Sequence, residues 1–294
     1  MGMKKGTIAG LTAAAAAAAL LAESEYEKKH FEIRRYRVHT DKLGEEWNGS
    51  RLVFLSDLHG NSFGENNIRL KEAMEEIRPE AVLIGGDMMI VKPWKEMDFS
   101  GLEDLLQWLC GRYPVYYANG NHESRMGSEP EVYPGWYSVF QEMLKRTGIT
   151  WLSDSHAEIK KGESSLHLYG LNIEKEYYNK GKIRPLTADY VKEHLGSCCE
   201  DGYCLLLAHT PVYLKDYAAW GADLILSGHF HGGTIRLPGL GGVMSPQFQF
   251  FSPFNRDVVY ENGVPMVISA GLGTHSVNIR LNNPPQIVVL ELKT

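Results

Sequence analysis

The sequence has few cysteines for its length. Only four occur among 294 residues, at Cys110, Cys198, Cys199 and Cys204. They lack the paired CxxC spacing of a structural zinc site, and they are too few for a disulfide-stapled scaffold. We therefore expect free, partly buried thiols. The alternative, if the domain is exported, is a disulfide between Cys204 and one of Cys198 or Cys199.

The sequence also lacks an excess of positive charge. It has 30 basic and 36 acidic residues, a formal net charge of −6. This balance makes nucleic acid an unlikely partner, because such binding needs a broad basic surface. It does not exclude a local pocket of positive charge. With 44% hydrophobic and 22% charged residues, the chain should fold around a substantial core. We find no internal repeat and no interdomain linker, and assign residues 51–294 to one domain.

No long run of strongly apolar residues is present, but the N-terminus carries an uncharged, alanine-rich stretch. A short basic segment at 1–6 precedes it, and the stretch covers residues 7–22. This pattern is typical of a signal peptide or a membrane anchor, although a spanning helix needs about 20 apolar residues and alanine is weakly hydrophobic. We expect an uncleaved anchor, because Leu20 fits a cleavage site poorly. A cleaved signal of an exported protein and an alanine-rich soluble helix are the alternatives.

The residues after this stretch do not settle which face of the membrane the domain would occupy. Basic residues stand on both sides of the uncharged stretch, so the positive-inside rule gives no orientation. Residues 23–50 are expected to form a charged stalk and an edge strand at 31–38.

Five apolar runs of strand length each lead into a candidate metal ligand. The runs at 51–56, 81–86, 114–119, 203–208 and 222–227 lead, in that order, to Asp57 with His59, to Asp87, to Asn121, to His209, and to His229 with His231. Sites in open α/β sheets form beyond the carboxyl ends of the strands, so these side chains should meet. Seven ligands are too many for one tetrahedral zinc ion. They suit two divalent ions about 3.5–4 Å apart that share a carboxylate.

The rest of the pattern predicts the surrounding fold. Helical periodicity occurs at 65–78, 101–111 and 135–147, and a β-hairpin is expected at 155–171. After Gly233 the chain looks mainly β, with strands expected at 234–237, 264–270, 277–281 and 287–292. An α/β first half and a strand-rich second half predict two packed sheets with helices outside.

The order Asp-x-His, Gly-Asp, Gly-Asn-His-Glu, a lone His and Gly-His-x-His resembles the calcineurin-like metallophosphoesterase superfamily, over residues 51 to about 235. The resemblance implies an α/β fold, a four-layer α-β-β-α sandwich of two mixed sheets. It implies one metal ion on Asp57, His59, Asp87 and His231, and a second on Asp87, Asn121, His209 and His229. Asp87 would bridge the two ions. His122 would contact substrate and assist the leaving group.

The segments at 56–59 and 229–233 most resemble the membrane-associated bacterial branch related to UDP-2,3-diacylglucosamine hydrolase, although Thr234 follows the glycine pair where we expect Gln. The implied activity is hydrolysis of a phosphate ester, diester or pyrophosphate by a metal-bridging hydroxide. The ions would be Mn, Fe, Zn, Co or Ni, the donor types being suited to borderline divalent metals. The substrate would be a small-molecule or lipid-linked phosphate. Its identity stays open, as does the oligomeric state.

Two other functions are compatible with the same ligands. One is a non-catalytic metal-binding adaptor, and the other is a dimetal hydrolase of a non-phosphate bond. Three further features carry expectations of their own. Glu123 should support a ligand from behind or be exposed. His275 should be an ordinary loop histidine, and the alternative is a place at the rim of the site. The aromatic segment 246–254 should pack in the core, or else form an apolar lip that touches a membrane or a lipid-bearing substrate.

Overall fold

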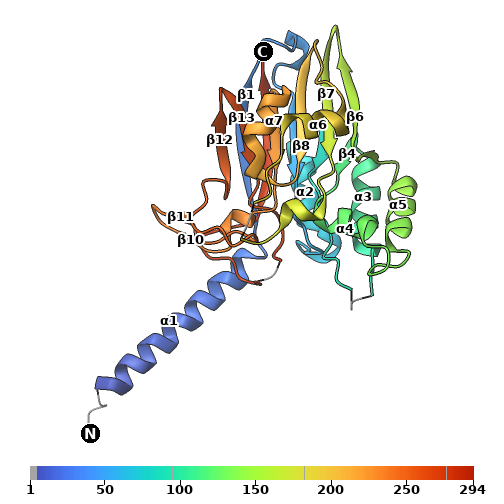
Figure 1. Ribbon diagram of the computed structural model, residues 1–294. Coiled ribbons are helices and arrows are strands. Elements are labelled where there is room, and N and C mark those ends of the chain that lie inside the picture. Colours follow the sequence, from blue (N-terminus) through green and yellow to red (C-terminus); the bar gives the residue numbers. More distant parts are fainter. Residues whose placement is uncertain (1–4, 94–95, 182, 276) are drawn as a thin grey trace.

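The structure is a computed structural model that describes residues 5–93, 96–181, 183–275 and 277–294. Residues 1–4 of the predicted basic N-terminus lie outside the described residues. Two six-stranded sheets pack against each other, and helices cover their outer faces (Figure 1). This is the predicted four-layer α-β-β-α sandwich of two mixed sheets.

The first sheet has the strand order β1-β14-β2-β3-β4-β5. Its members are β1 (Glu32–His39), β14 (Gln286–Lys293), β2 (Arg51–Leu55), β3 (Ala81–Ile84), β4 (Val115–Ala118) and β5 (Thr150–Leu152). β2, β3 and β4 run parallel, so their carboxyl ends lie at one edge of the sheet. β1 is the edge strand and pairs with β14, near the end of the chain.

The second sheet has the order β12-β13-β9-β8-β7-β6. Its members are β12 (Asp257–Glu261), β13 (Val264–Ile268), β9 (Leu224–Ser227), β8 (Tyr203–Ala208), β7 (Ser164–Leu171) and β6 (Ser155–Lys161). The four central strands are parallel, and an antiparallel strand closes each edge. β6 and β7 form the predicted hairpin. A small ribbon, β10 (Arg236–Leu237) with β11 (Gly241–Gly242), lies beside this sheet.

Alternation of side chains along the strands produces the layers. Leu52 and Phe54 of β2 point into the core between the sheets. Val53 and Leu55, one position along, pack against the helices of the first sheet. Those helices are α2 (Ile68–Ile77), α3 (Ser100–Cys110) and α5 (Trp136–Thr147); α6 (Ala188–Leu195) and α7 (Leu214–Trp220) cover the second sheet. The described residues also form short 3-10 helices: η1 (Glu45–Trp47), η2 (Glu65–Asn67), η3 (Lys175–Tyr178), η4 (Pro211–Tyr213) and η5 (His231–Gly233).

The strand predicted at 277–281 is wrong. In the described part of this segment only one isolated bridge forms, between Leu281 and Ile235. The reason is Arg280, whose side chain is 1% exposed and donates to the carbonyl oxygens of Ala270, Gly273 and Asn283. Since these acceptors surround the guanidinium, the backbone curls around it as a loop.

Helix α1 (Lys5–Glu27) contains the whole predicted anchor and projects away from the domain (Figure 1). None of the helices within the described ranges is both long enough and apolar enough to cross a membrane. The last turn of α1 docks on the loop around Arg280. The hydroxyl of Ser24 accepts a hydrogen bond from Arg280 N, and the Glu27 carboxylate accepts one from Asn283 N.

Candidate metal centre

All seven predicted ligands and His122 lie together where strands of both sheets end. Asp57 and His59 follow β2, Asp87 follows β3, and Asn121 begins helix α4 (Asn121–Ser128) after β4. His209 follows β8, His229 follows β9, and His231 begins η5. Each of these side chains is at most 8% exposed. The parallel strands therefore gather residues that are far apart in the sequence.

Five of the seven candidate ligands have a left-handed backbone. The φ angles are 53° at Asp57, 49° at His59, 53° at Asp87, 66° at His229 and 48° at His231. This conformation is uncommon for residues with a side chain, and each instance costs on the order of 1–3 kcal/mol. The surrounding structure holds the loops there: for example, the His59 amide donates to the Asp87 carbonyl over 3.0 Å.

Two glycines allow the ligand loops to approach one another. A side chain at Gly228 would overlap the Asp57 carboxylate, and one at Gly86 would overlap the backbone of Gly120. Gly86 also has a φ of 86°, which disfavours any residue with a side chain. These glycines let the loops lie close enough for their side chains to bind the same metal ion.

A first group of possible metal ligands consists of Asp57, His59 and His231. The His231 Nε2 atom lies 3.5 Å from Asp57 Oδ1 and 3.1 Å from His59 Nε2. Ser56 Oγ and His229 N donate to the Asp57 carboxylate, which fixes its orientation. The Asp57 carboxylate thereby keeps one side facing the imidazoles of His59 and His231.

A second group consists of Asp87, His209 and His229. His209 Nε2 lies 3.2 Å from Asp87 Oδ2. A terminal atom of the Asn121 side-chain amide lies 3.0 Å from His229 Nδ1 and 3.2 Å from Asp87 Oδ2. The amide of Asn121 is thus close enough to offer its oxygen to a cation that lies between His229 and Asp87. The donor set of this group therefore fits a divalent ion.

Hydrogen bonds fix the ring orientation of two histidines. His209 Nδ1 lies 2.7 Å from the carbonyl oxygen of Gly85 and must donate to it, which leaves the Nε2 lone pair for a metal. His122 Nδ1 instead accepts from Val91 N at 2.9 Å. The proton of neutral His122 therefore sits on Nε2, which has no hydrogen-bond partner in the described part of the chain. His122 is thus a buried donor without a protein acceptor.

The carboxylates make the centre attractive to positive charge. Burial alone lowers the pKa of His209, but Asp87 and Asp57 outweigh it and raise the pKa to about 10. Burial lowers the pKa of His59, His229 and His231 well below the ordinary value, and neighbouring imidazoles contribute. Three imidazoles are thus held neutral, which is the form that binds metals.

Glu123 supports the centre from behind, as expected. Its carboxylate is 1% exposed and accepts hydrogen bonds from the backbone N–H groups of Asp87, Met88 and Gly120, and from the Tyr117 hydroxyl. These bonds join the loop after β3 to the start of α4. Glu123 therefore holds Asp87 and Asn121 in one frame.

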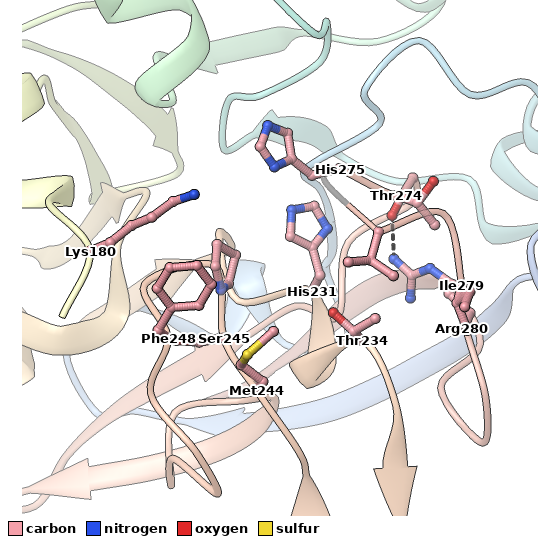
Figure 2. Close-up of a pocket in the computed structure, with 13 residues that line it drawn as sticks. Lys180, His231, Thr234, Met244, Ser245, Phe248, Thr274, His275, Ile279 and Arg280 are labelled. Carbon is pink, nitrogen blue, oxygen red and sulfur yellow. Dashed lines mark hydrogen bonds between the residues drawn. The ribbon is translucent and has the colours of Figure 1, made fainter.

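His275 lies beside the centre, which was the less favoured of its two predicted places. Its ring centroid lies 4.9 Å from that of His122, 5.2 Å from that of His59 and 6.4 Å from that of His231. Figure 2 shows His231 and His275 beside a pocket that opens next to the centre. The only local signal in the sequence was the glycine-rich stretch before it.

Basic residues near the mouth make the surroundings locally positive, despite the net charge of the chain. Lys180 lines the pocket of Figure 2. Together with Arg125 and Lys92 it helps to lower the pKa of His275, of which burial is the main cause. This is the local positive region that the composition left open, and it suits an anionic ligand.

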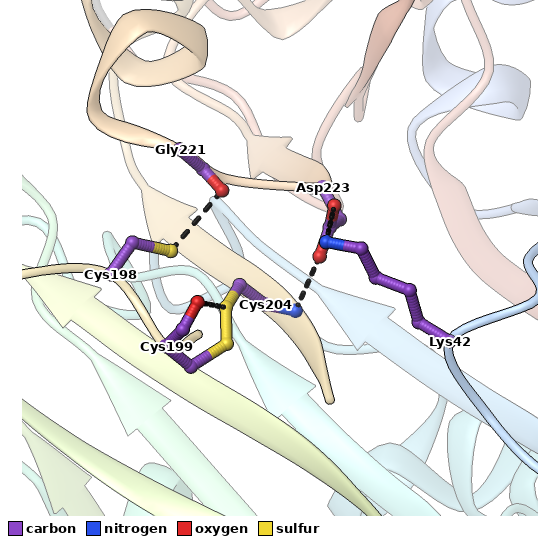
Figure 3. Close-up of a disulfide and its surroundings, with 6 residues drawn as sticks. All are labelled: Lys42, Cys198, Cys199, Cys204, Gly221 and Asp223. Atoms are coloured by element: carbon purple, nitrogen blue, oxygen red, sulfur yellow. Dashed lines mark hydrogen bonds and ion pairs between the residues drawn. A yellow bond between two sulfur atoms is a disulfide. The ribbon is translucent and has the colours of Figure 1, made fainter. Parts of the chain in front are cut away.

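The cysteines lie away from this centre, and the expectation of four free thiols is wrong. Cys199 and Cys204 form a disulfide, and Cys198 beside them is free (Figure 3). Cys110 is free as well. The loop before β8 folds back so that the two Cα atoms lie 6.3 Å apart, within the range that a disulfide spans. Cys198 Sγ instead donates to the Gly221 carbonyl.

Comparison with known proteins identifies the family. The model of the calcineurin-like phosphoesterase family matches residues 50–233. The chain belongs to this family, and it is a metal-dependent hydrolase that acts on phosphoester bonds. The family depends on two metal ions, and the clustered aspartates and histidines of this chain could bind them.

Three relatives show the range of the similarity. The chain is 26% identical to the uncharacterized metallophosphoesterase YkoQ of Bacillus subtilis, over 80% of this chain and 81% of that protein. It is 27% identical to phosphodiesterase YaeI of Escherichia coli, over 82% of each. It is 29% identical to a transmembrane protein with metallophosphoesterase domain from Danio rerio, over 87% of this chain and 56% of that protein.

Proposed function

We propose that this protein is a dinuclear metal-dependent phosphodiesterase. Asp57, His59 and His231 would hold one ion. Asn121, His209 and His229 would hold the other, and Asp87 would bridge them. The observation that best supports this proposal is that the two ligand groups are contiguous. His209 Nε2 lies 3.7 Å from Asp57 Oδ1 and 3.2 Å from Asp87 Oδ2.

The bound ions would polarise the phosphate and lower the pKa of a water to about 7, so that hydroxide is present at neutral pH. The chain itself would orient the substrate. His122 would donate from Nε2 to the leaving oxygen, because its Nδ1 is already occupied by Val91 N. Lys180 and Arg125 would attract the anionic phosphate.

A phosphate diester is favoured over a monoester by two observations. The relative from E. coli is named a phosphodiesterase. Two pockets also border the centre, one that includes His231 and one that includes His59. A diester has two substituents to place, whereas a monoester has one.

We extend the proposal to a lipid-linked or envelope substrate at a membrane surface. In the aromatic segment, Phe250 is 65% exposed, and Phe248 lines the pocket beside His231. Helix α1 docks on the loop that lines the same pocket, through Ser24 and Arg280. A helix that is uncharged over residues 7–22 and exposed aromatic rings would favour an interface with lipid.

The test uses the full chain, freed of metal and reloaded with Mn²⁺. Bis(p-nitrophenyl) phosphate, p-nitrophenyl phosphate and a pyrophosphate diester are assayed with and without chelator. The proposal predicts chelator-sensitive hydrolysis that is fastest with the phosphate diester. Metal binding without turnover of any of the three would favour the adaptor, and a faster monoester would reject the diester preference.

A further inference from the structure

The pocket beside His231 has a lining unlike that of the metal centre. Met244, Pro246 and Ile279 form its walls, while Phe248 and Val277 stand at its rim. His231 and His275 form the side toward the centre (Figure 2). An apolar chamber thus opens directly on a candidate metal ligand.

We propose that this pocket binds an apolar substituent of the substrate phosphodiester, of the size of one ring or a chain of about six carbons. The inference rests on the proposed function and adds the chemistry of one substrate arm. The pocket offers about 120 Å³. An engineered apolar cavity of about 150 Å³ binds benzene, so a group of that size fits.

The rim is held in place and is not an unpacked loop. Ser245 Oγ accepts a hydrogen bond from Gln249 N, and the buried Gln247 side chain donates to the Tyr177 carbonyl. Phe248 has a φ of 60°, a strained conformation for a bulky residue. The residue is nevertheless 51% exposed. Strained backbone conformations cluster at active sites and ligand clamps, and this one presents an aromatic side chain to the pocket.

Charge at the mouth is placed to orient an amphiphile. Lys180 Nζ lies 4.8 Å from the centre of the Phe248 ring, and Figure 2 shows it across the opening from His275. The phosphoryl group would lie between Lys180 and the centre, with the apolar arm directed past Phe248 toward Met244. The substituent would leave water there while its phosphate stays near the cation.

A second pocket, which includes His59, is less apolar and explains why the apolar arm would bind in the first. That pocket is lined by His59 and mixes Met88 and Leu102 with amide and carboxylate side chains, among them Asn61 and Asn66. The Nε2 atoms of His59 and His231 lie 3.1 Å apart, so the two pockets meet at the centre. A diester with one apolar and one polar arm would fill both.

A series of alkyl p-nitrophenyl phosphodiesters tests the arm directly, with the Mn²⁺-loaded full chain. Arms of methyl, butyl, hexyl and dodecyl are compared, and phenyl represents an aromatic ring. Burial of a methylene is worth about 0.8 kcal/mol, so kcat/KM should rise roughly two- to fourfold per carbon up to hexyl. A further gain with dodecyl, in phosphatidylcholine vesicles, would identify a lipid chain as the source. A plateau at hexyl or phenyl would identify a short substituent. Equal values for methyl and hexyl would overturn the proposal.

Matched variants separate the pocket from the aromatic segment in general. F248S and M244Q should abolish the dependence on arm length. F250S changes an equally aromatic neighbour that does not line the pocket and should keep it. If the dependence on arm length is lost in all three variants, or in none, the assignment of the apolar arm to this pocket is wrong.

A binding measurement keeps the inference separate from the proposed function. Hexyl methylphosphonate and dimethyl phosphate are titrated into the Mn²⁺-loaded protein by calorimetry. The hexyl compound should bind at least tenfold more tightly, and F248S should remove the difference. If the protein binds the hexyl compound more tightly but hydrolyses no phosphodiester, the proposed function is wrong and the assignment of the pocket is supported. Hydrolysis of phosphodiesters without a preference for the hexyl compound in binding would refute the assignment of the pocket and leave the proposed function intact.

Discussion

The Nε2 atoms of His59 and His231 lie 3.1 Å apart, although 172 residues separate them in the sequence. Two buried imidazole nitrogens at this distance share one proton or face one cation. Asp57 Oδ1, 3.5 Å from His231 and 3.9 Å from His59, completes a group suited to a metal ion. This contact between the two sheets lies where the metal pair is proposed.

Asp87→Asn should remove both ions or leave one. Asp87 is the ligand that both sites would share, and supporting residues alone are worth roughly 10- to 100-fold in metal affinity or activity. We therefore expect kcat/KM to fall by more than roughly 100-fold. Elemental analysis should find fewer than two ions per chain. The exposed Asp201 provides the control D201N, and two retained ions in D87N would refute the bridge.

His122→Ala should keep the metals and lose turnover. The loss should be roughly 10²- to 10⁴-fold, the usual contribution of a positioned proton donor. Because Val91 N donates to His122 Nδ1, His122→Asn is a second variant that keeps a polar group there. Metal content and circular dichroism report on integrity. Full activity in both variants would remove the assigned role.

Glu123→Gln should weaken metal binding without touching a ligand. The carboxylate accepts four hydrogen bonds from protein groups, and an amide nitrogen would meet donors. Leaving such groups unsatisfied costs about 1–3 kcal/mol, which thermal unfolding should detect. Tyr117→Phe removes only one of the four bonds and should have a smaller effect. Equal losses of stability and metal affinity in the two variants would contradict the role of Glu123 in holding Asp87 and Asn121 together.

The base of α1 should stabilise the loop that carries His275. Glu27 accepts from Asn283 N, and Asn283 Nδ2 in turn donates to the His231 carbonyl over 2.7 Å. Glu27→Ala should lower the unfolding free energy by about 1–3 kcal/mol and weaken Mn²⁺ binding. Glu23→Ala, on an exposed position of the same helix, is the control. Unchanged unfolding in E27A would show that the contact carries no stability.

Metal binding should release a proton at pH 8. In the metal-free protein Asp87 and Asp57 outweigh burial and raise the pKa of His209 to about 10. His209 is therefore protonated at pH 8, and a metal needs it neutral. Mn²⁺ affinity should rise as pH increases toward 10. Calorimetry in buffers of different ionisation enthalpy counts the protons, and a count of zero would contradict this account.

The ligand motifs were predictable because each is short, contiguous and placed directly after an apolar run. The strand pattern alone therefore indicated that they would meet. His275 and Arg280 have no such local signal. Their places depend on the packing of the loop between β13 and β14 against α1, through contacts such as Arg280 N to Ser24 Oγ, 256 residues apart. The strand predicted at 277–281 failed for the same reason.

The disulfide shows the same limit. Cys204 had two candidate partners in the sequence, and the choice of Cys199 depends on how the loop before β8 turns. The side chain of Cys198 points instead to Gly221, at the end of α7. Sequence spacing could limit the alternatives but could not choose between them.

The central claim is a pair of metal ions bridged by Asp87. Crystals of the full chain grown with Mn²⁺, with data collected at the manganese absorption edge, test it most directly. The account predicts two anomalous peaks about 3.5–4 Å apart. One should lie beside His59 and His231, the other beside His209 and His229, and Asp87 between them. A single peak, or none among these side chains, would contradict it.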